Sequence, residues 1–304
     1  MPTLHKMAQT TEQTLLDPQL MAKLEQLELL TRKIFRGSMK GERRSKRRGE
    51  SVEFADYRHY VPGDDLRFLD WNVDARLDKL FLKLFLEEED LHVSVLFDIS
   101  KSMDWGKPVT KGLYAKRIAA ALAYIGLCNY DRVSLYAFSD HLQYEMKGMR
   151  GRRATAQMLH FLEEIEFEGG SNLVNTCKHY AIRHPQRGIV ILLSDFLDKD
   201  GFESGLRFLL SRELDLYVIQ IMSPDELDPT LTGDLKLKDV EDDDLAEVTV
   251  TRALINRYKQ NVQTYCQSLK EYCARRGVNY LFATPEVDFD QLVLNVLRRR
   301  GLVK

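Results

Sequence analysis

The stretch Val93-Ser94-Val95-Leu96-Phe97-Asp98-Ile99-Ser100-Lys101-Ser102 decides the fold, because an apolar run stops there at a carboxylate and two hydroxyls. Residues 93–97 are mostly β-branched or apolar, which predicts a buried strand. Asp98, Ser100 and Ser102 follow it at alternating positions and offer the hard oxygen atoms that Mg²⁺ or Mn²⁺ prefers. Ligands bind at the carboxyl ends of strands in parallel sheets. The stretch therefore predicts a metal site, although short Ser/Asp strings on their own are also common in turns.

Two later segments supply further oxygen ligands. Ser171 follows the glycine pair Gly169-Gly170, which allows tight backbone geometry, and its hydroxyl is also placed to cap the next helix. The apolar run 188–193 reads as a second buried strand and ends at Ser194-Asp195. The combination is more specific than any one motif. The candidate metal ligands are Asp98, Ser100, Ser102, Ser171 and Asp195.

This arrangement resembles the metal-ion-dependent adhesion site of von Willebrand factor A-like domains, over about residues 91–285. That pattern is Asp-x-Ser-x-Ser, then a Thr in a second loop and an Asp in a third. Ser171 stands where the pattern has Thr, so the hydroxyl is kept and a methyl group is lost. The resemblance implies a Rossmann-like α/β fold. Strand and helix patterns alternate after Ser102, which predicts a mainly parallel sheet with helices on both faces.

The expected organisation has four parts. They are an N-terminal tail and helix over 1–36, a basic loop and small β-rich segment over 37–90, a von Willebrand factor A-like domain over 91–285 with a hairpin insertion near 224–251, and a C-terminal helix over 286–304. The helices expected from apolar periodicity cover 17–35, 112–129, 154–165, 173–182, 202–211, 252–276 and 289–299.

The upstream segment carries a second signature. Its elements are Gly49-Glu50-Ser51-Val52-Glu53-Phe54-Ala55-Asp56-Tyr57-Arg58, Pro62-Gly63-Asp64-Asp65, Asp70-Trp71 and Ala75-Arg76. Together they closely resemble a bacterial family, the domain of unknown function number fifty-eight, from about residue 37 to 285. Members of that family are often encoded beside MoxR-type AAA+ ATPases and are thought to act as metal-dependent binding adaptors for them. The resemblance implies a MoxR-type AAA+ ATPase as a partner. Many longer members carry N-terminal membrane spans, and this chain looks like the short soluble form.

Composition favours a cytoplasmic protein. The formal net charge is −2, and no apolar stretch approaches the roughly 20 residues that cross a bilayer. The N-terminus lacks the apolar core of a signal peptide. The four cysteines show no C-x-x-C spacing and are interpreted as small buried apolar residues in a reducing compartment. No membrane span is therefore expected.

A dense basic loop, Lys40 to Arg48, is the strongest charge feature of the chain. Such a loop binds phosphates or nucleic acid, or it is simply solvated and paired with the acidic stretches 87–90 and 241–244. No aromatic residue interleaves it, which disfavours binding to single strands. We expect no specific nucleic-acid partner.

Two classes of function fit the candidate ligands. In the first, the chain is a non-enzymatic module in which Ser100, Ser102 and Ser171 ligate Mg²⁺ or Mn²⁺, while two Asp residues act directly or through water. An Asp or Glu of a client protein then fills an open position. In the second, the site is a metal-dependent hydrolase or phosphotransferase. That chemistry needs a base or a second metal, and only Asp104 and Asp198 offer extra carboxylates near it, so we expect no enzyme.

Overall fold

The computed structural model forms two compact units, Met1–Arg32 with Leu91–Lys304 and, separately, Lys33–Asp90. The structure describes residues 15–27, 53–62, 64, 66–71, 73, 79–86, 91–184, 187–212, 214–230, 233–238, 245–287 and 289–292. The basic loop Lys40 to Arg48 and both acidic stretches lie outside the described residues.

A six-stranded sheet organises the larger unit, in the order β10-β7-β6-β3-β4-β5. Neighbouring strands run parallel except for β5, which pairs antiparallel with β4 at one edge. The strand that ends at Asp98 lies between β6 and β4, so its carboxyl end is flanked on both sides. The strands are β3 His92–Asp98, β4 Arg132–Phe138, β5 Leu142–Met149, β6 Gly188–Ser194, β7 Leu214–Ile221 and β10 Asn279–Ala283.

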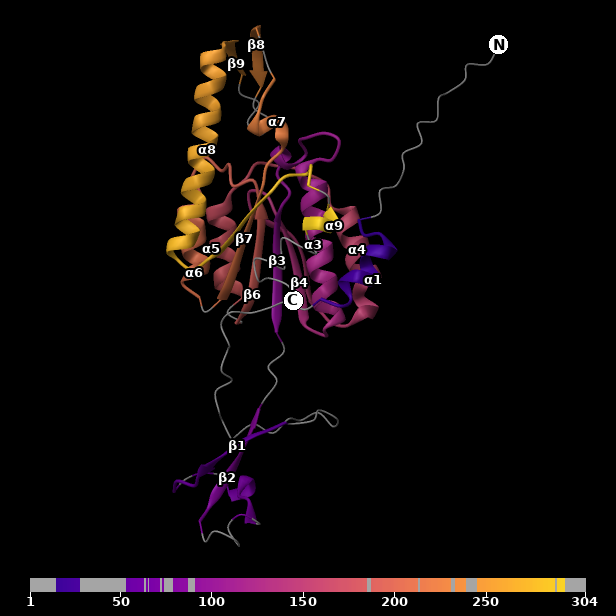
Figure 1. Cartoon of the computed structure of the whole chain (residues 1–304), viewed down its shortest axis with the longest axis vertical. Helices are drawn as coiled ribbons and strands as arrows, with labels where there is room; N and C mark the ends of the chain where they lie inside the picture. Colours follow the sequence, from indigo (N-terminus) through magenta and orange to yellow (C-terminus); the bar gives the residue numbers. More distant parts are fainter. Residues whose placement is uncertain are drawn as a thin grey trace, which may run out of the picture. The chain divides into compact units, whose positions relative to one another are not determined.

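Helices cover both faces of this sheet, as expected (Figure 1). Residues of α1, α3 and α4 pack into the hydrophobic cluster on one face, and residues of α5, α6 and α8 pack into the cluster on the other. The helices are α1 Pro18–Leu24, η2 Lys101–Met103, α3 Lys111–Cys128, η3 Arg152–Ala154, α4 Thr155–Glu164, α5 Leu173–Arg183, α6 Glu203–Leu210, α7 Pro224–Leu227, α8 Arg252–Arg275 and α9 Phe289–Gln291.

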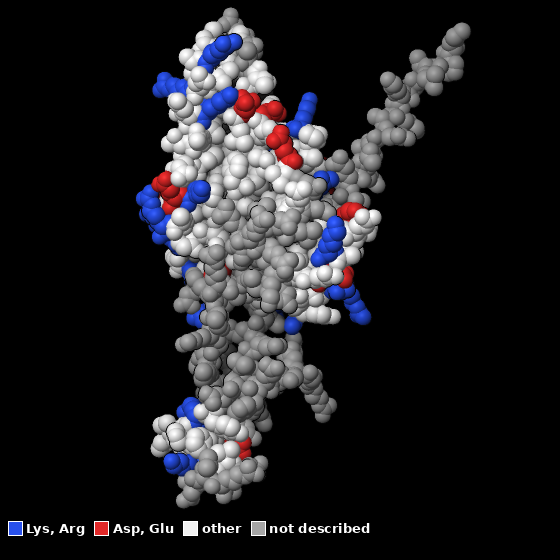
Figure 2. Space-filling model, in the orientation of Figure 1, with Lys and Arg blue, Asp and Glu red and all other residues white. Residues whose placement is uncertain are grey.

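The predicted insertion forms an antiparallel hairpin, β8 Gly233–Lys238 with β9 Leu245–Val250. It follows the short helix α7, which the sequence patterns did not predict. On the face that Figure 2 shows, acidic side chains gather at α7 and basic side chains lie on α8 beside it. An ion pair between Lys259 of α8 and Asp228 joins the two regions.

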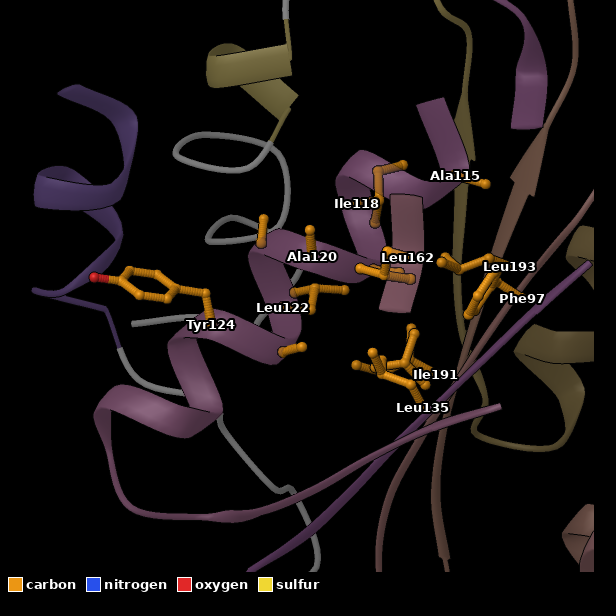
Figure 3. Packing of buried hydrophobic residues seen from close by; sticks show 14 of the residues in the cluster. Phe97, Ala115, Ile118, Ala120, Leu122, Tyr124, Leu135, Leu162, Ile191 and Leu193 are labelled. Atoms are coloured by element: carbon orange, nitrogen blue, oxygen red, sulfur yellow. The ribbon is translucent and has the colours of Figure 1, made fainter. Parts of the chain in front are cut away.

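The apolar core lies between α3 and the sheet. Phe97 of β3, Leu193 of β6 and Ile118 of α3 are fully buried and point into this layer (Figure 3). Because successive side chains of a strand point to opposite faces, Leu96 packs in the cluster on the other side. Tyr124 points the other way, toward α1, and donates a hydrogen bond of 2.7 Å to Glu25. The core therefore fixes β3 from both faces.

Two elements differ from the sequence prediction, and a third, expected helix lies mostly outside the described residues. The helix expected over 17–35 begins at Pro18 but ends at Leu24, and residues 28–35 lie outside the described part. The antiparallel strand β5 was missed, because an edge strand with exposed polar positions gives no strong apolar pattern. Of the helix expected over 289–299, the described residues include only the short α9 and Leu292.

The smaller unit contains an antiparallel pair, β1 Glu53–His59 with β2 Phe81–Leu86, and the turn η1 Leu66–Phe68. The guanidinium of Arg58 donates to both carboxylate oxygens of Asp64, at 2.8 and 2.7 Å. A bidentate Arg–carboxylate pair of this kind is stronger and more directional than a single ion pair.

Candidate metal centre

The structure brings the five predicted ligands together at the carboxyl ends of β3 and β6. The Ser100 and Ser102 hydroxyl oxygens lie 3.0 Å apart, and Ser102 Oγ lies 3.2 Å from Asp195 Oδ2. On the other side, Ser171 Oγ donates to Asp98 Oδ2 over 3.4 Å. These contacts link all three loops. The side chains of Asp98, Ser100 and Asp195 are buried.

Backbone hydrogen bonds hold the loop of Ser171 against the loop of Ser100. The Lys101 amide donates to the Gly169 carbonyl at 3.1 Å, and the Glu168 amide donates to the Ile99 carbonyl at 2.9 Å. Gly169 has a φ of 77°, and a Cβ there would lie 3.0 Å from Ser139 Oγ. Only glycine fits this close turn without strain.

Asn172 caps α5, not Ser171. The Asn172 side chain accepts a hydrogen bond of 2.9 Å from the Asn175 amide. The alternative role that the sequence offered for Ser171 is therefore wrong, and its hydroxyl is directed to Asp98 instead.

Asp98 is held in a buried polar nest. Its Oδ1 accepts from the Ser100 amide at 2.9 Å, and its Oδ2 accepts from the Ser194 hydroxyl at 2.7 Å. Burial, and then the negative charge of Asp195, raise the pKa of Asp98 to about 7. A bound cation reverses such a shift, because it favours the ionised carboxylate.

Sequence reasoning missed three residues of this centre: Ser194, Lys111 and Glu226. Lys111 Nζ donates to Asp195 Oδ2 at 2.7 Å and to Glu226 Oε1 at 2.6 Å. One signal for Lys111 was present, since a cation in the first turn of an apolar helix opposes the helix dipole. Glu226 lies far along the chain on a helix of one turn, and gave no comparable signal.

The donor set fits a small hard cation. An octahedral Mg²⁺ with bonds of about 2.1 Å places neighbouring ligand oxygens about 3 Å apart. The separations at Ser102, 3.0 Å to Ser100 and 3.2 Å to Asp195, are close to this value. In the described part of the chain no three His, Cys, Asp or Glu side chains gather as a metal site. The present set has two carboxylates and relies on hydroxyls for the rest.

Asp198, an extra carboxylate near the site, has a structural task. Its Oδ2 accepts from the Leu173 amide at 2.6 Å, at the first residue of α5, and its Oδ1 accepts from the Asp200 amide at 2.8 Å. A carboxylate at a helix N-terminus is stabilised by the unpaired amides there. Through these bonds Asp198 joins the loop after β6 to the start of α5.

The topology and the loop geometry together define an α/β domain of the von Willebrand factor A-like class. The chain belongs to the family described as "Protein of unknown function DUF58", which matches residues 56–267. None of the described helices has both the length and the apolar character to span a bilayer.

Curated relatives are similar over most of the chain. The chain is 26% identical over 242 residues to uncharacterized protein Mb1516 of Mycobacterium bovis, covering 78% of this chain and 76% of the relative. The same values hold for uncharacterized protein Rv1480 of Mycobacterium tuberculosis.

Solved structures with a similar fold include conserved hypothetical protein BatB from Bacteroides thetaiotaomicron, with 13% identity and a TM-score of 0.43, covering 69% of this chain and 98% of that one. An aerotolerance-related membrane protein from Bacteroides fragilis shows 15% identity and a TM-score of 0.44, covering 69% of this chain and 98% of that one. The SpRpn10 VWA domain shows 11% identity and a TM-score of 0.37, covering 68% of this chain and 95% of that one.

Replacing Ser194 with alanine is expected to lower the free energy of unfolding by about 1–3 kcal/mol, because two buried partners lose their bond. The Ser194 hydroxyl donates to Asp98 and accepts from the Phe196 amide at 2.9 Å. Urea titration measures the change. Ser211→Ala is the control, since that exposed hydroxyl donates to the Phe208 carbonyl, and its loss should stay within about 0.5 kcal/mol. If both variants lost the same free energy of unfolding, the buried hydrogen-bonding role described for Ser194 would be contradicted.

Proposed function

We propose that this chain is a non-enzymatic protein-binding module that recognises its partner through a bound divalent cation, Mg²⁺ or Mn²⁺. The observation that carries the proposal is the convergence of five oxygen-bearing residues at one edge of the sheet, with the oxygens around Ser102 spaced as in an octahedral site. The residues are Ser100, Ser102, Ser171, Asp98 and Asp195.

Each residue has a distinct part in this proposal. The hydroxyls of Ser100, Ser102 and Ser171 hold the cation, and neutral ligands leave it electron-poor. Asp98 and Asp195 orient those hydroxyls or bind directly. When bound, the cation supplies an open coordination position for an oxygen of the partner. An Asp or Glu side chain suits that position best, because it adds charge as well as a ligand.

The commitment of Asp198 to α5 supports binding over hydrolysis. A hydrolase or phosphotransferase needs a carboxylate or imidazole that is free to take a proton from water. Asp198 is held by two backbone amides, and Asp104 is exposed at the end of η2. We therefore propose no catalytic step at this site.

We propose a MoxR-type AAA+ ATPase as the partner, or a client protein that offers Asp or Glu. This part rests on the family resemblance. The cytoplasm, where such an ATPase finds its ATP, is the proposed location. We propose no specific nucleic-acid partner.

A pull-down with purified MoxR-type ATPase tests this function. We expect the amount of ATPase recovered in excess Mg²⁺ to fall about tenfold or more in EDTA, because the partner's carboxylate then has no metal ion to coordinate. Ser102→Ala should bind poorly in both conditions. Ser268→Ala, which changes an exposed hydroxyl on α8, should behave as wild type. Equal recovery with and without Mg²⁺ would reject the metal bridge.

A further inference from the structure

The side chain of Lys111 is fully buried, which is rare for lysine. A buried ammonium is stable only when it is paired and hydrogen-bonded. Here Nζ bonds Asp195 Oδ2 at 2.7 Å and Glu226 Oε1 at 2.6 Å. Burial alone lowers the pKa of Lys111, but the charges of Asp195 and Glu226 outweigh it and raise the pKa above its usual value. The two carboxylate contacts therefore place a paired ammonium inside the centre.

Glu226 is fixed independently of Lys111. Its second oxygen, Oε2, accepts from the Ser223 amide at 2.8 Å, and the Ser223 hydroxyl accepts from the Glu226 amide at 3.3 Å. This reciprocal capping box begins α7 and sets the position of the carboxylate. The ammonium thus bridges one candidate metal ligand, Asp195, and one rigid carboxylate outside the ligand set.

The ammonium and the candidate ligand Ser102 share one oxygen. Asp195 Oδ2 accepts from Lys111 Nζ at 2.7 Å and from Ser102 Oγ at 3.2 Å. The other oxygen of Asp195, Oδ1, accepts from the Leu197 amide at 3.0 Å. A cation held by Ser102 and Asp195 would therefore meet a like charge that already uses the same carboxylate oxygen.

We propose that Lys111 is an internal competitor of the divalent cation and sets the affinity of the centre, with Glu226 holding the ammonium when Asp195 turns to the metal. The inference rests on the proposed function and adds its regulation. Glu226 follows β7 and precedes the β8–β9 hairpin. Occupation of the centre is thereby coupled to α7, a segment outside the three ligand loops.

Opposite changes in metal affinity test this role. Like charges within a few ångströms repel strongly in a buried site, so Lys111→Met combined with Glu226→Gln should bind Mn²⁺ about tenfold more tightly or better. Glu226→Gln alone should bind Mn²⁺ more weakly, because Lys111 then depends wholly on Asp195. A purely structural role would weaken binding in both variants.

Isothermal titration of the full chain with Mn²⁺ alone, repeated with Mg²⁺, gives these affinities. Lys116→Met is the matched control: it removes another buried lysine of α3, whose ammonium bonds the Ile165 carbonyl and lies 4.9 Å from the Phe167 ring. It should leave the affinity unchanged. Lys111→Arg, which keeps the charge, should bind Mn²⁺ no more tightly than wild type.

The outcomes separate the inference from the function on which it rests. Tight binding by the double variant with none by wild type would support the competition and reject metal-dependent binding by the native chain. Equal affinities of wild type and the double variant, or tighter binding by Glu226→Gln alone, would overturn the competition while leaving the metal centre intact. No binding by any variant would reject both.

Discussion

Replacing Phe97 with alanine is expected to lower the free energy of unfolding by about 3–5 kcal/mol, the largest effect that we predict. Phe97 is fully buried between β3 and α3, one residue before Asp98. Truncation removes apolar burial and leaves a cavity, because the flanking strands and α3 restrict collapse. The centre should weaken as well, since the strand that positions Asp98 loses its anchor.

Urea titration of wild type and variant measures this effect. The dependence of the unfolding free energy on urea concentration should be the same in both proteins, so that the shift in midpoint reports stability. Phe97→Leu is the first control and should cost much less, because it keeps most of the side-chain volume. Phe208→Ala is the second, since Phe208 on α6 is 38% exposed. A loss below about 1.5 kcal/mol for Phe97→Ala would contradict the packing described for β3.

Replacing Asp98 with asparagine should abolish the stabilisation of the fold by Mg²⁺. Free Mg²⁺ at a hundred times its dissociation constant stabilises a protein with one site by about 2.7 kcal/mol. Asparagine keeps Oδ1 as the acceptor for the Ser100 amide, and its NH2 group replaces Oδ2 and can donate to the Ser194 hydroxyl. The change removes the charge and keeps the side-chain shape, so the fold should persist. Thermal melts in EDTA and in excess Mg²⁺ separate the two proteins. Asp104→Asn, an exposed change in the same loop, should keep the full Mg²⁺ response.

The pH dependence of stability gives Asp98→Asn a second signature. The pKa of Asp98 is raised to about 7 by burial and by Asp195, above the value of about 4 in the unfolded chain. The folded state then holds a proton that the unfolded state releases, so wild-type stability in EDTA should fall as pH rises from about 4 to about 7. Asp98→Asn should lack this loss. Parallel pH profiles would show that Asp98 does not titrate as described.

The strand ends were predictable from the sequence because two separate apolar runs, 93–97 and 188–193, each stop at an Asp or Ser-Asp. The run 93–97 is apolar at 93, 95 and 97 on one face and at 96 on the other, which is typical of a strand covered by helices on both faces. Its carboxyl end then lies beside that of 188–194, and Asp98 and Asp195 converge.

The charge balance of the centre was not predictable in the same way. Lys111 and Glu226 lie far apart in the sequence and belong to helices, and no spacing rule joins them. Their pairing depends on where α7 lies after β7, which is a tertiary fact. Ser194 was visible as the residue before Asp195, but its contact with Asp98 needs the register of β6 against β3.

The number of Mn²⁺ ions bound per chain, counted by electron paramagnetic resonance during a titration, tests the metal centre most directly. We predict one tightly bound ion in wild type and its loss in Asp98→Asn, with the paramagnetic signal then matching free Mn²⁺. A wild-type chain that binds no Mn²⁺, or an Asp98→Asn chain that binds it equally well, would contradict the assignment of this centre.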